Sequence, residues 1–439
     1  MKQVLQSYRT GELTLEEVPP PALQAGGVLV RTRASAVSAG TEMQMVQLAR
    51  MSLLGKARAR PDLVRRVLQK VRTEGVLATW RQVCARLDEP VAMGYSCSGE
   101  VLEAGPDGGA FRAGQRVACA GVGFASHSEV NYVPRLLCTP VPDGVPLDQA
   151  AFVALGAIAM QGLRQGRVAV GDVVAVIGLG LIGQITVQLL RAAGCRVVGT
   201  DLDGDRRQRA AAAGAQAVGP EQFVPAVQAA SEGQGADAVL ITAASDSSEI
   251  MVTAAEAARL RGRIVVVGFV GMNFPQKPFY EKELEVRFSM SYGPGRYDPQ
   301  YEHRGCDYPY SLVRWTEGRN MAAFLEMVAR GAVDLGGLIT HRFPIDRALD
   351  AYAMLDAGRE SSLGIVLTYD RPAEQALGPA RVTWGPARAA GGELRVGVIG
   401  AGDYARRTLL PALRRCRGVR LRGLATASGR SAAHAGRRF

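Results

Sequence analysis

The chain has 439 residues, of which 47% are hydrophobic and 21% are charged, so it is long enough for two or three domains of an ordinary soluble protein. No run of about 20 apolar residues is free of helix breakers, which argues against a membrane-spanning helix, and the N-terminal stretch MKQVLQSYRTGELTLEE has no apolar signal core. The seven cysteines are scattered singly without a C-x-x-C pair, as is typical of free thiols in a reducing compartment. We therefore expect a cytoplasmic protein with no membrane partner.

The net charge of +11 comes from the C-terminal part of the chain. From Arg381 onward there are 13 basic and two acidic residues, whereas residues 1–380 contain 39 of each. A nucleic-acid-binding body would carry a basic surplus of its own. The charge distribution therefore gives no support to a nucleic-acid partner for the main body.

Residues 1–150 alternate apolar and polar positions in short stretches such as GGVLVRTRASAVS and GQRVACAG. This period of two predicts a β-rich, barrel-like domain. From about residue 43 to 87 the apolar spacing becomes helical (LVRRVLQKVRTEGVLATWRQVCARL), which predicts an inserted helical hairpin. We interpret its basic face as solvated, and a grip on an anionic substrate is the alternative.

Residues 151–290 alternate apolar strands with helical stretches, which predicts a doubly wound parallel sheet. Within it, Gly178-x-Gly180-x-x-Gly183 follows a buried strand and opens a helix. The first glycine permits the tight turn, the second lets a pyrophosphate approach the backbone, and the third lets helix and strand pack closely. The alternative is a glycine-rich turn in a sheet that binds no nucleotide.

The strand after this turn ends at Asp201, where a carboxylate can accept both ribose hydroxyls and repel a 2′-phosphate. We therefore predict NAD(H) rather than NADP(H), although Arg206 and Arg207 lie close enough to keep NADP(H) open. The residues expected to bind the cofactor are Gly178, Gly180, Leu181, Ile182, Gly183, Asp201, Thr242 and Gly268.

Residues 291–371 begin with an aromatic, polar and Gly/Pro-rich stretch, SYGPGRYDPQYEHRGCDYPY, and return to helical and strand-like patterns. Long charged and aromatic loops in compact domains often bind ligands, and Arg with Tyr and Asp suits a polyhydroxylated or anionic, sugar-like substrate. The alternative is an oligomer contact or a packed Ω-loop. The candidate substrate residues are Arg296, Tyr297, Asp298, Tyr301 and Arg314.

The remainder of the chain is predicted to be a linker and an incomplete unit. Residues 372–394 are rich in Ala, Gly and Pro, which predicts the linker. Residues 395–439 then repeat the strand, Gly400-x-Gly402-x-x-Ala405 turn and helix, which predicts the start of a second dinucleotide-binding unit.

Over about residues 1–370 the chain resembles the medium-chain dehydrogenase/reductase superfamily, through AVSAGTE (36–42), GYSCSGEV (94–101), the glycine turn and LITHRFPIDRALDAYAML (338–355). The resemblance implies a GroES-like catalytic domain interrupted by a Rossmann domain, with the chain returning to the first domain and substrate bound in the cleft between them. It also implies a dimer or tetramer and a small-molecule substrate. Residues 395–439 resemble the start of the Gfo/Idh/MocA family of sugar and cyclitol oxidoreductases, so the chain looks like part of a two-enzyme fusion.

Zinc-dependent members of the superfamily carry metal ligands at positions occupied here by Ala39, Tyr95 and Leu155. Ala and Leu carry no donor atom, and Tyr is not a usual zinc ligand, so we predict no zinc. Thr41 matches the proton-relay hydroxyl of the superfamily, and Tyr95 would donate a hydrogen bond to a developing alkoxide. The alternative is that Tyr95 only fills the space left by the metal.

The sequence therefore predicts a zinc-independent NAD(H)-dependent oxidoreductase that acts on an alcohol or carbonyl, such as a sugar or nucleotide-sugar derivative. One alternative is a quinone- or enone-type NAD(P)H reductase. The other is a catalytically silent sensor or scaffold that binds a dinucleotide.

Overall fold

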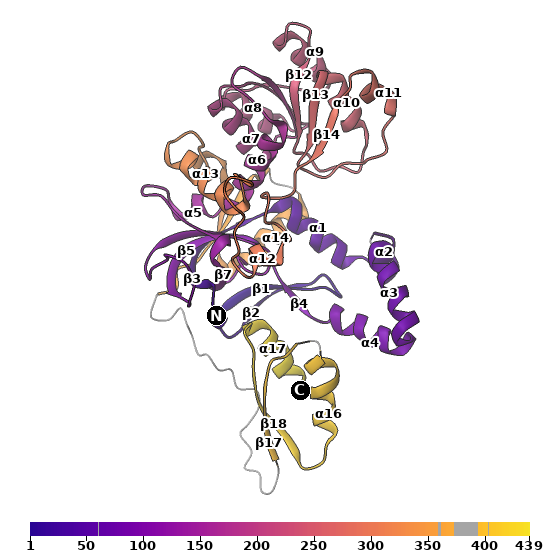
Figure 1. Ribbon diagram of the computed structural model, residues 1–439, viewed down its shortest axis with the longest axis vertical. Helices are drawn as coiled ribbons and strands as arrows, with labels where there is room; N and C mark the ends of the chain where they lie inside the picture. The colour runs from indigo at the N-terminus through magenta and orange to yellow at the C-terminus, as the bar shows by residue number, and fades with distance from the viewer. Residues whose placement is uncertain (60, 359–360, 373–393, 403) are drawn as a thin grey trace.

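The computed structural model describes residues 1–59, 61–358, 361–372, 394–402 and 404–439. Three parts are stacked along the longest axis of the molecule (Figure 1). The parallel sheet with its helices is at the top, the antiparallel sheets are in the middle, and the C-terminal unit is at the bottom. The predicted linker, 372–394, falls almost wholly on residues 373–393, which lie outside the described residues.

The middle part contains one wholly antiparallel sheet and one that is antiparallel except for the parallel pair β15 and β16. One has three strands in the order β2 (Leu13–Glu17), β1 (Lys2–Ser7) and β4 (Pro90–Ala92). In the other, the path is β15 (Ile339–Pro344), β16 (Gly364–Thr368), β3 (Gly27–Val37), β5 (Ser96–Ala104), β6 (Arg116–Ala120) and β8 (Cys138–Pro140), while β7 (Val130–Pro134) also pairs with β3. Strand β16 lies antiparallel to β3, with Ile365 opposite Val37, so the chain completes this sheet after passing through the parallel one.

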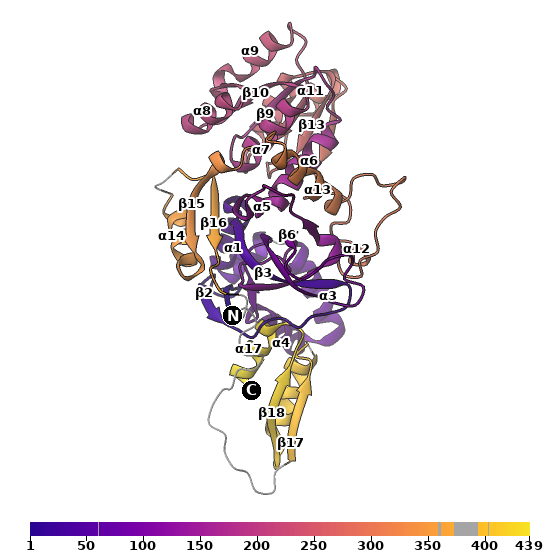
Figure 2. The ribbon, with the colours of Figure 1, turned by 90° about the vertical axis from the view of Figure 1, so that its left-hand side faces the viewer.

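A helical arm leaves the middle part directly after β3. It consists of α1 (Ala39–Arg50), α2 (Leu53–Ala59), α3 (Pro61–Glu74) and α4 (Val76–Leu87). It extends sideways from the sheets in Figure 1 and lies behind them in Figure 2. The expected hairpin from about residue 43 is therefore corrected to four helices that begin at Ala39. The sequence pattern missed the first turn because the first buried position of α1 is an acid, Glu42, followed at helical spacing by Val46 and Ala49.

The upper part is a six-stranded, wholly parallel sheet. Its order is β11 (Gln216–Val218), β10 (Arg196–Thr200), β9 (Val173–Ile177), β12 (Ala236–Ile241), β13 (Ala258–Val266) and β14 (Glu285–Phe288). This is the 3-2-1-4-5-6 order of the Rossmann fold. All five residues of β9 are buried, because helices cover both faces. The helices are α6 (Val153–Gly166), α7 (Leu181–Ala192), α8 (Gly204–Ala212), α9 (Pro220–Ala230), α10 (Glu249–Ala257) and α11 (Gln276–Glu281).

Shorter elements and two further helices connect the upper and middle parts. They are α5 (Leu147–Ala150), α12 (Pro299–Glu302), α13 (Glu317–Ala329), α14 (Ala348–Ala357) and the 3₁₀ turns Arg135–Leu137, Gly336–Leu338 and Ile345–Arg347. Helix α13 packs on α6, where the ring of Phe324 lies against the backbone of Gly156. Side chains of both helices belong to one core that includes Tyr95 and Val176, so the two parts share a continuous hydrophobic core.

The C-terminal unit has two parallel strands, β17 (Leu394–Ile399) and β18 (Val419–Ala425), with a π-helical turn at Ala405–Leu409 and helices α16 (Leu410–Arg415) and α17 (Gly429–Arg438). It packs on the three-stranded sheet. Ala433 joins a core cluster with Leu5, Val18 and Ala92, and the amide of Ala22 donates to the carbonyl of Ala427 at 3.0 Å.

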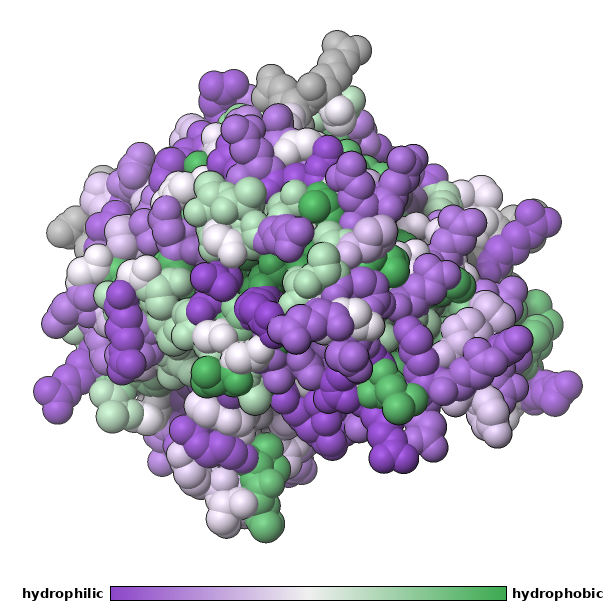
Figure 3. Space-filling model, turned by 90° about the horizontal axis from the view of Figure 1, so that it is seen from above, coloured by the Kyte–Doolittle hydropathy of each residue, from purple (hydrophilic) through white to green (hydrophobic). Residues whose placement is uncertain are grey.

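No helix among the described ranges is long and apolar enough to cross a membrane. The face seen from above is covered mainly by hydrophilic residues, with apolar ones in small groups (Figure 3).

Replacing Gly156 by Ala should destabilise the protein, even though Ala favours a helix by about 1 kcal/mol over Gly. A β-carbon at this position would lie 2.2 Å from the ring of Phe324, so the packed α6–α13 contact would have to open. We expect a loss of about 1–3 kcal/mol in the free energy of unfolding, measured by urea denaturation. The control is Gly40→Ala in α1, where a β-carbon would meet no heavy atom within 4 Å. Equal stability of the two variants would contradict the packing argument.

Candidate functional site: a glycine turn and a buried hydroxyl pair

The turn after β9 brings backbone segments into unusually close contact. Gly178 has a φ of +95°, and a β-carbon there would lie 2.6 Å from the amide nitrogen of Ala243. A β-carbon at Gly183 would lie 2.1 Å from the carbonyl oxygen of Gly178. At Gly180, by contrast, a β-carbon would meet no heavy atom within 4 Å. The first and third glycines are therefore needed for packing, and the second leaves the backbone open to an approaching ligand.

Gly180 is also the N-cap of α7, and the first amide of the helix to donate within it is that of Gln184, to the carbonyl of Gly180 at 2.8 Å. The preceding amides, including those of Leu181, Ile182 and Gly183, have no intrahelical acceptor. Together with the helix dipole, such amides favour an anionic group. The turn therefore fits a pyrophosphate.

Asp201, which follows β10, is fixed beside this turn. One carboxylate oxygen accepts from the amide of Leu179 at 2.7 Å, and the other accepts from the amide of Asp203 at 2.9 Å. Arg206 lies 3.8 Å from Asp201 and 3.5 Å from Asp203, while Arg207 donates to the carbonyl oxygens of Asp201 and Leu202. These two arginines are the residues that left NADP(H) as an alternative cofactor. Arg206 is already paired with acids and Arg207 with carbonyl oxygens.

Thr242 and Gly268 lie at the ends of the neighbouring strands and contact the same turn. The hydroxyl of Thr242 donates to the carbonyl of Gly178 at 2.5 Å. A β-carbon at Gly268 would lie 2.0 Å from the carbonyl oxygen of Ala243. The structure therefore brings the glycine turn, Thr242 and Gly268 together, and gives the last two a role in closing the turn.

Tyr95 precedes β5 and is 7% exposed. Its hydroxyl donates to that of Ser38 at 2.8 Å and also interacts with the hydroxyl of Thr41. Burial raises the pKa of Tyr95, and the hydrogen bonds to Ser38 and Thr41 oppose this only partly, so the phenol is neutral and can donate a proton. Thr41 itself is exposed. The two predicted hydroxyls are therefore neighbours, and Ser38 is a third that the sequence did not suggest.

Beneath these hydroxyls is a buried polar network that the sequence pattern did not reveal. Glu42 is only 1% exposed. Its carboxylate accepts hydrogen bonds from the amide of Ser38, at 2.9 Å, and from the hydroxyl of Tyr352. One of its oxygens also lies 3.1 Å from Nε2 of His127. Nδ1 of His127 is 2.7 Å from the hydroxyl of Ser35. The sequence feature that could have indicated this network is Glu42 itself, an acid that directly follows Thr41 and occupies a buried position of a helical pattern. The network fixes Ser38, and through it the orientation of Tyr95.

The positions of zinc ligands in the superfamily do not fit a zinc ion. Ala39 and Leu155 carry no donor atom, and Leu155 is part of the hydrophobic core with Tyr95. Within the described ranges, no three or more His, Cys, Asp or Glu side chains are grouped so that they could hold a metal ion.

The structure divides the predicted substrate cluster into buried and exposed members. Tyr301 is 1% exposed, and its hydroxyl donates to that of Thr316 at 3.0 Å; this corrects the expectation that it contacts substrate. Asp298 caps α12 and accepts from the Tyr308 hydroxyl at 2.6 Å. Tyr297 is 69% exposed. Arg314 stacks instead on Trp315.

Arg296 belongs to a buried group with Tyr292, Glu302 and Glu317. It forms an ion pair of 2.5 Å with Glu302. Both oxygens of Glu317 and the hydroxyl of Tyr292 are buried and have no hydrogen-bond partner among the described residues. Burial and the charge of Glu302 raise the pKa of Glu317 to about 9, against a lowering by Arg296, so Glu317 is a neutral acid at pH 7. Tyr292 belongs to the same hydrophobic core cluster as Tyr95, which connects this group to the candidate site.

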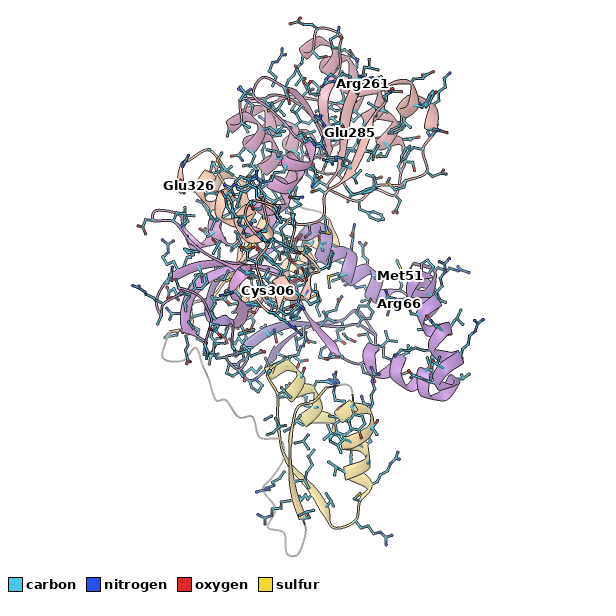
Figure 4. All side chains as sticks on the ribbon, in the orientation of Figure 1. Met51, Arg66, Arg261, Glu285, Cys306 and Glu326 are labelled. Atoms are coloured by element: carbon cyan, nitrogen blue, oxygen red, sulfur yellow. The ribbon has the colours of Figure 1, made fainter. Side chains whose placement is uncertain are left out.

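A cavity of about 350 Å³ lies elsewhere, between the β1–β2 turn and the helical arm. It is lined by Arg9, Arg50, Lys56, Trp80 and Cys84 among others. Met51, which also lines it, is labelled in Figure 4 together with Arg66 of the same arm. None of its lining residues belongs to the glycine turn, so we do not assign it to the cofactor.

Replacing Glu317 by Gln should make the stability less sensitive to rising pH. The pKa of Glu317 is raised from 4.5 to about 9 by folding. Below pH 4.5 the carboxyl is protonated in both states; between the two values only the unfolded chain loses the proton, so the free energy of unfolding falls by up to about 1.4 kcal/mol per pH unit. The neutral amide removes this loss. Urea unfolding at about pH 5 and about pH 8 should show a smaller decrease for the variant.

The matched control for this prediction is Glu326→Gln on the same helix. Glu326 is half-exposed and pairs with Arg330 at 2.7 Å; it is labelled on α13 in Figure 4. This variant should keep the pH dependence of the wild type. Parallel pH dependence of wild type and Glu317→Gln would contradict a neutral Glu317.

Comparison with known proteins adds a family relation to this geometry. Residues 182–303 match the family model described as zinc-binding dehydrogenase. A (R,R)-butanediol dehydrogenase of Bacillus subtilis is 27% identical over 203 residues, which are 40% of this chain and 58% of the relative. An L-arabinitol 4-dehydrogenase of Talaromyces emersonii is 26% identical over 304 residues, covering 59% of this chain and 72% of the relative. The chain thus aligns with little more than half of the first relative and nearly three quarters of the second.

The solved structure of an alcohol dehydrogenase from Thermus sp. ATN1 superposes with a TM-score of 0.63 at 19% identity, covering 84% of this chain and all of that one. This similarity confirms the predicted fold, a GroES-like domain combined with a Rossmann domain. The relatives are oxidoreductases.

Proposed function

We propose, from the relation of this chain to the zinc-binding dehydrogenases, that it is an NAD(H)-dependent oxidoreductase of an alcohol or carbonyl group that works without catalytic zinc. The related polyol dehydrogenases favour a sugar or polyol derivative as substrate. The observation that carries the proposal is the open Gly180 at the N-terminus of α7 with Asp201 fixed beside it. We further propose that the protein is cytoplasmic and homo-oligomeric, and that residues 395–439 are related to the Gfo/Idh/MocA enzymes.

The chain offers contacts for the pyrophosphate and the adenosine ribose of the dinucleotide. The free amides of α7 would bind the pyrophosphate, and the Asp201 carboxylate would accept hydrogen bonds from the adenosine ribose. Because Arg206 and Arg207 are engaged by acids and carbonyls, neither is free to bind a 2′-phosphate. When bound, the nicotinamide would accept or supply the hydride.

The proton of the reaction is assigned to Tyr95 and Thr41. A neutral, buried phenol donates a hydrogen bond to an oxygen that gains negative charge, and it does so most effectively where water is excluded. The exposed Thr41 hydroxyl, in contact with Tyr95, would pass the proton to solvent. Arg296 and Tyr297 remain proposed contacts of a polyhydroxylated substrate, with Arg296 oriented by Glu302.

The chemistry of the donor set supports the part of the proposal that concerns zinc. Tyr95 occupies a ligand position, but its raised pKa opposes the phenolate that a metal would require. Ala39 and Leu155 supply no donor at the other two positions. A quinone- or enone-type reductase would need the same cofactor contacts, and Asp201 disfavours the NADPH such enzymes use.

Asp201→Ala should weaken NADH binding by about tenfold, the effect of losing about 1.4 kcal/mol of ribose hydrogen bonding. Calorimetric titration with NADH and NADPH measures this, and the difference between the two affinities should shrink. The control is Asp205→Ala, an exposed acid at the start of α8, which should leave NADH binding unchanged. If the folded wild type bound neither dinucleotide, the proposed function would be wrong.

Tyr95→Phe should lower turnover with an aldehyde, ketose and enone panel by at least about tenfold, because the proton donor is lost while the ring still fills its site. NADH affinity should stay the same, since Tyr95 is not placed in the dinucleotide contacts. NADH consumption measures turnover. Near-wild-type turnover would show that Tyr95 only fills space. NADH binding without oxidation by any carbonyl or enone would instead support the sensor or scaffold.

A further inference from the structure

Trp315, just before α13, is held between two arginines. The guanidinium carbon of Arg164 lies 3.3 Å from the centroid of the Trp315 ring, and that of Arg314 lies 3.7 Å from it. Two guanidinium groups at these distances would overlap on one face, so they occupy opposite faces of the indole. We call Arg164, Trp315 and Arg314 the Trp315 stack. It places one positive charge over each face of a single rigid aromatic plane.

Neither arginine of the stack has a carboxylate partner among the described residues. Two acids of the surrounding segments pair with other arginines, and a third, Glu317, is buried and protonated. Asp307 pairs with Arg319 at 2.5 Å, and Glu285, labelled on β14 in Figure 4, lies between Arg167, Arg263 and Arg287. Arg164 uses only its Nε–H, in a hydrogen bond to Asn320, and Arg314 makes no hydrogen bond within the described ranges. The terminal N–H groups of both arginines therefore have no acceptor in that part of the chain.

The stack is rigidly supported. Nε of Arg164 donates to Oδ1 of Asn320 at 2.7 Å. Asn320 is fully buried and donates in turn to the carbonyl of Tyr292 at 2.9 Å and to Gln161 at 3.3 Å. On the other side, Arg319 donates to the carbonyls of Val313 and Tyr308, which holds the loop before Trp315. A ligand would find the donors already in place, so little ordering entropy opposes binding.

Burial and the like charge of Arg314 lower the pKa of Arg164 to about 10. Arg164 is therefore a partly desolvated cation without a counter-charge. Removing such a group from water costs free energy of folding unless an anion compensates its charge. The charge balance around the stack thus favours a ligand that carries more than one negative charge.

We propose that the Trp315 stack is a binding site for a phosphate group, supplied by inorganic phosphate or by a phosphorylated small molecule. The oxygens of a phosphate dianion can accept hydrogen bonds from both guanidinium forks at the edge of the indole. A monocarboxylate would neutralise only one of the two charges. None of the hydrogen bonds and ring contacts of the stack in the described part of the chain involves Tyr95, Ser38 or Thr41. The proposal therefore does not rest on the proposed dehydrogenase activity.

The test is a titration of the intact protein followed by tryptophan fluorescence at constant ionic strength, with chloride as the balancing anion, because screening alone alters exposed charges. The probes are inorganic phosphate, sorbitol 6-phosphate and sorbitol. Both phosphates should give a saturable change, and sorbitol none. Trp315→Phe should remove the signal, since it leaves Trp80 and Trp384 as the only other tryptophans.

Arg314→Gln should weaken phosphate binding by at least about tenfold, as expected for hydrogen bonds between charged groups. Arg164→Gln should weaken phosphate binding as well. Because Arg314 is exposed, Arg314→Gln tests the site without disturbing the core. Arg330→Gln, an exposed cation of α13, is the control and should bind as the wild type does. Tighter binding of sorbitol 6-phosphate than of phosphate would identify an organic phosphate as the ligand, and equal binding would identify the free ion. A non-saturable response, or equal weakening by Arg314→Gln and Arg330→Gln, would overturn the proposal.

Discussion

Helix α7 approaches the end of β9 so closely that a single methyl group between them would lie 2.1 Å from the carbonyl oxygen of Gly178. This backbone contact fixes the direction in which the helix leaves the sheet, and with it the direction of the free amides at its N-terminus. Asp201, Thr242 and Gly268 all contact the same turn or its neighbour Ala243. The candidate dinucleotide site is thus a property of main-chain packing at the carboxyl ends of four adjacent strands.

Two buried glutamates near the candidate site differ in the number of hydrogen-bond partners of their carboxyl groups. Glu42 receives hydrogen bonds from a backbone amide and a tyrosine hydroxyl and lies beside a histidine, so it can hold Ser38 and Tyr95 in place. Glu317 has no hydrogen-bond partner within the described ranges, and its carboxyl group remains protonated. The site therefore combines a rigid polar support beneath the reactive hydroxyls with a buried acid that the surrounding structure leaves uncompensated.

The sequence predicted the Rossmann sheet and the glycine turn well, because both depend on local patterns: buried β-branched strands, glycines at fixed spacing and an acid after the second strand. It failed where a residue acts through distant partners. Tyr301 looked like a ligand contact because it lies among charged residues, yet its partners Thr316 and Tyr308 make it part of the core. Tyr292 and Trp315 gave no local signal, and Glu42 gave only its position in a helical pattern, since its partner Tyr352 lies 310 residues away.

The pairing of β16 with β3 has a consequence for synthesis of the chain on the ribosome. On one side of β3, residues Ala34 to Val37 pair with Ile365 to Thr368, which are synthesised only after the whole parallel sheet. At about 5–20 residues per second, the edge of β3 next to Val37 stays unpaired for roughly tens of seconds. An apolar strand edge exposed for that long can associate prematurely with other nascent chains. Correct folding of the middle part therefore depends on rapid folding of the Rossmann sheet, which leaves the edge of β3 open for β16.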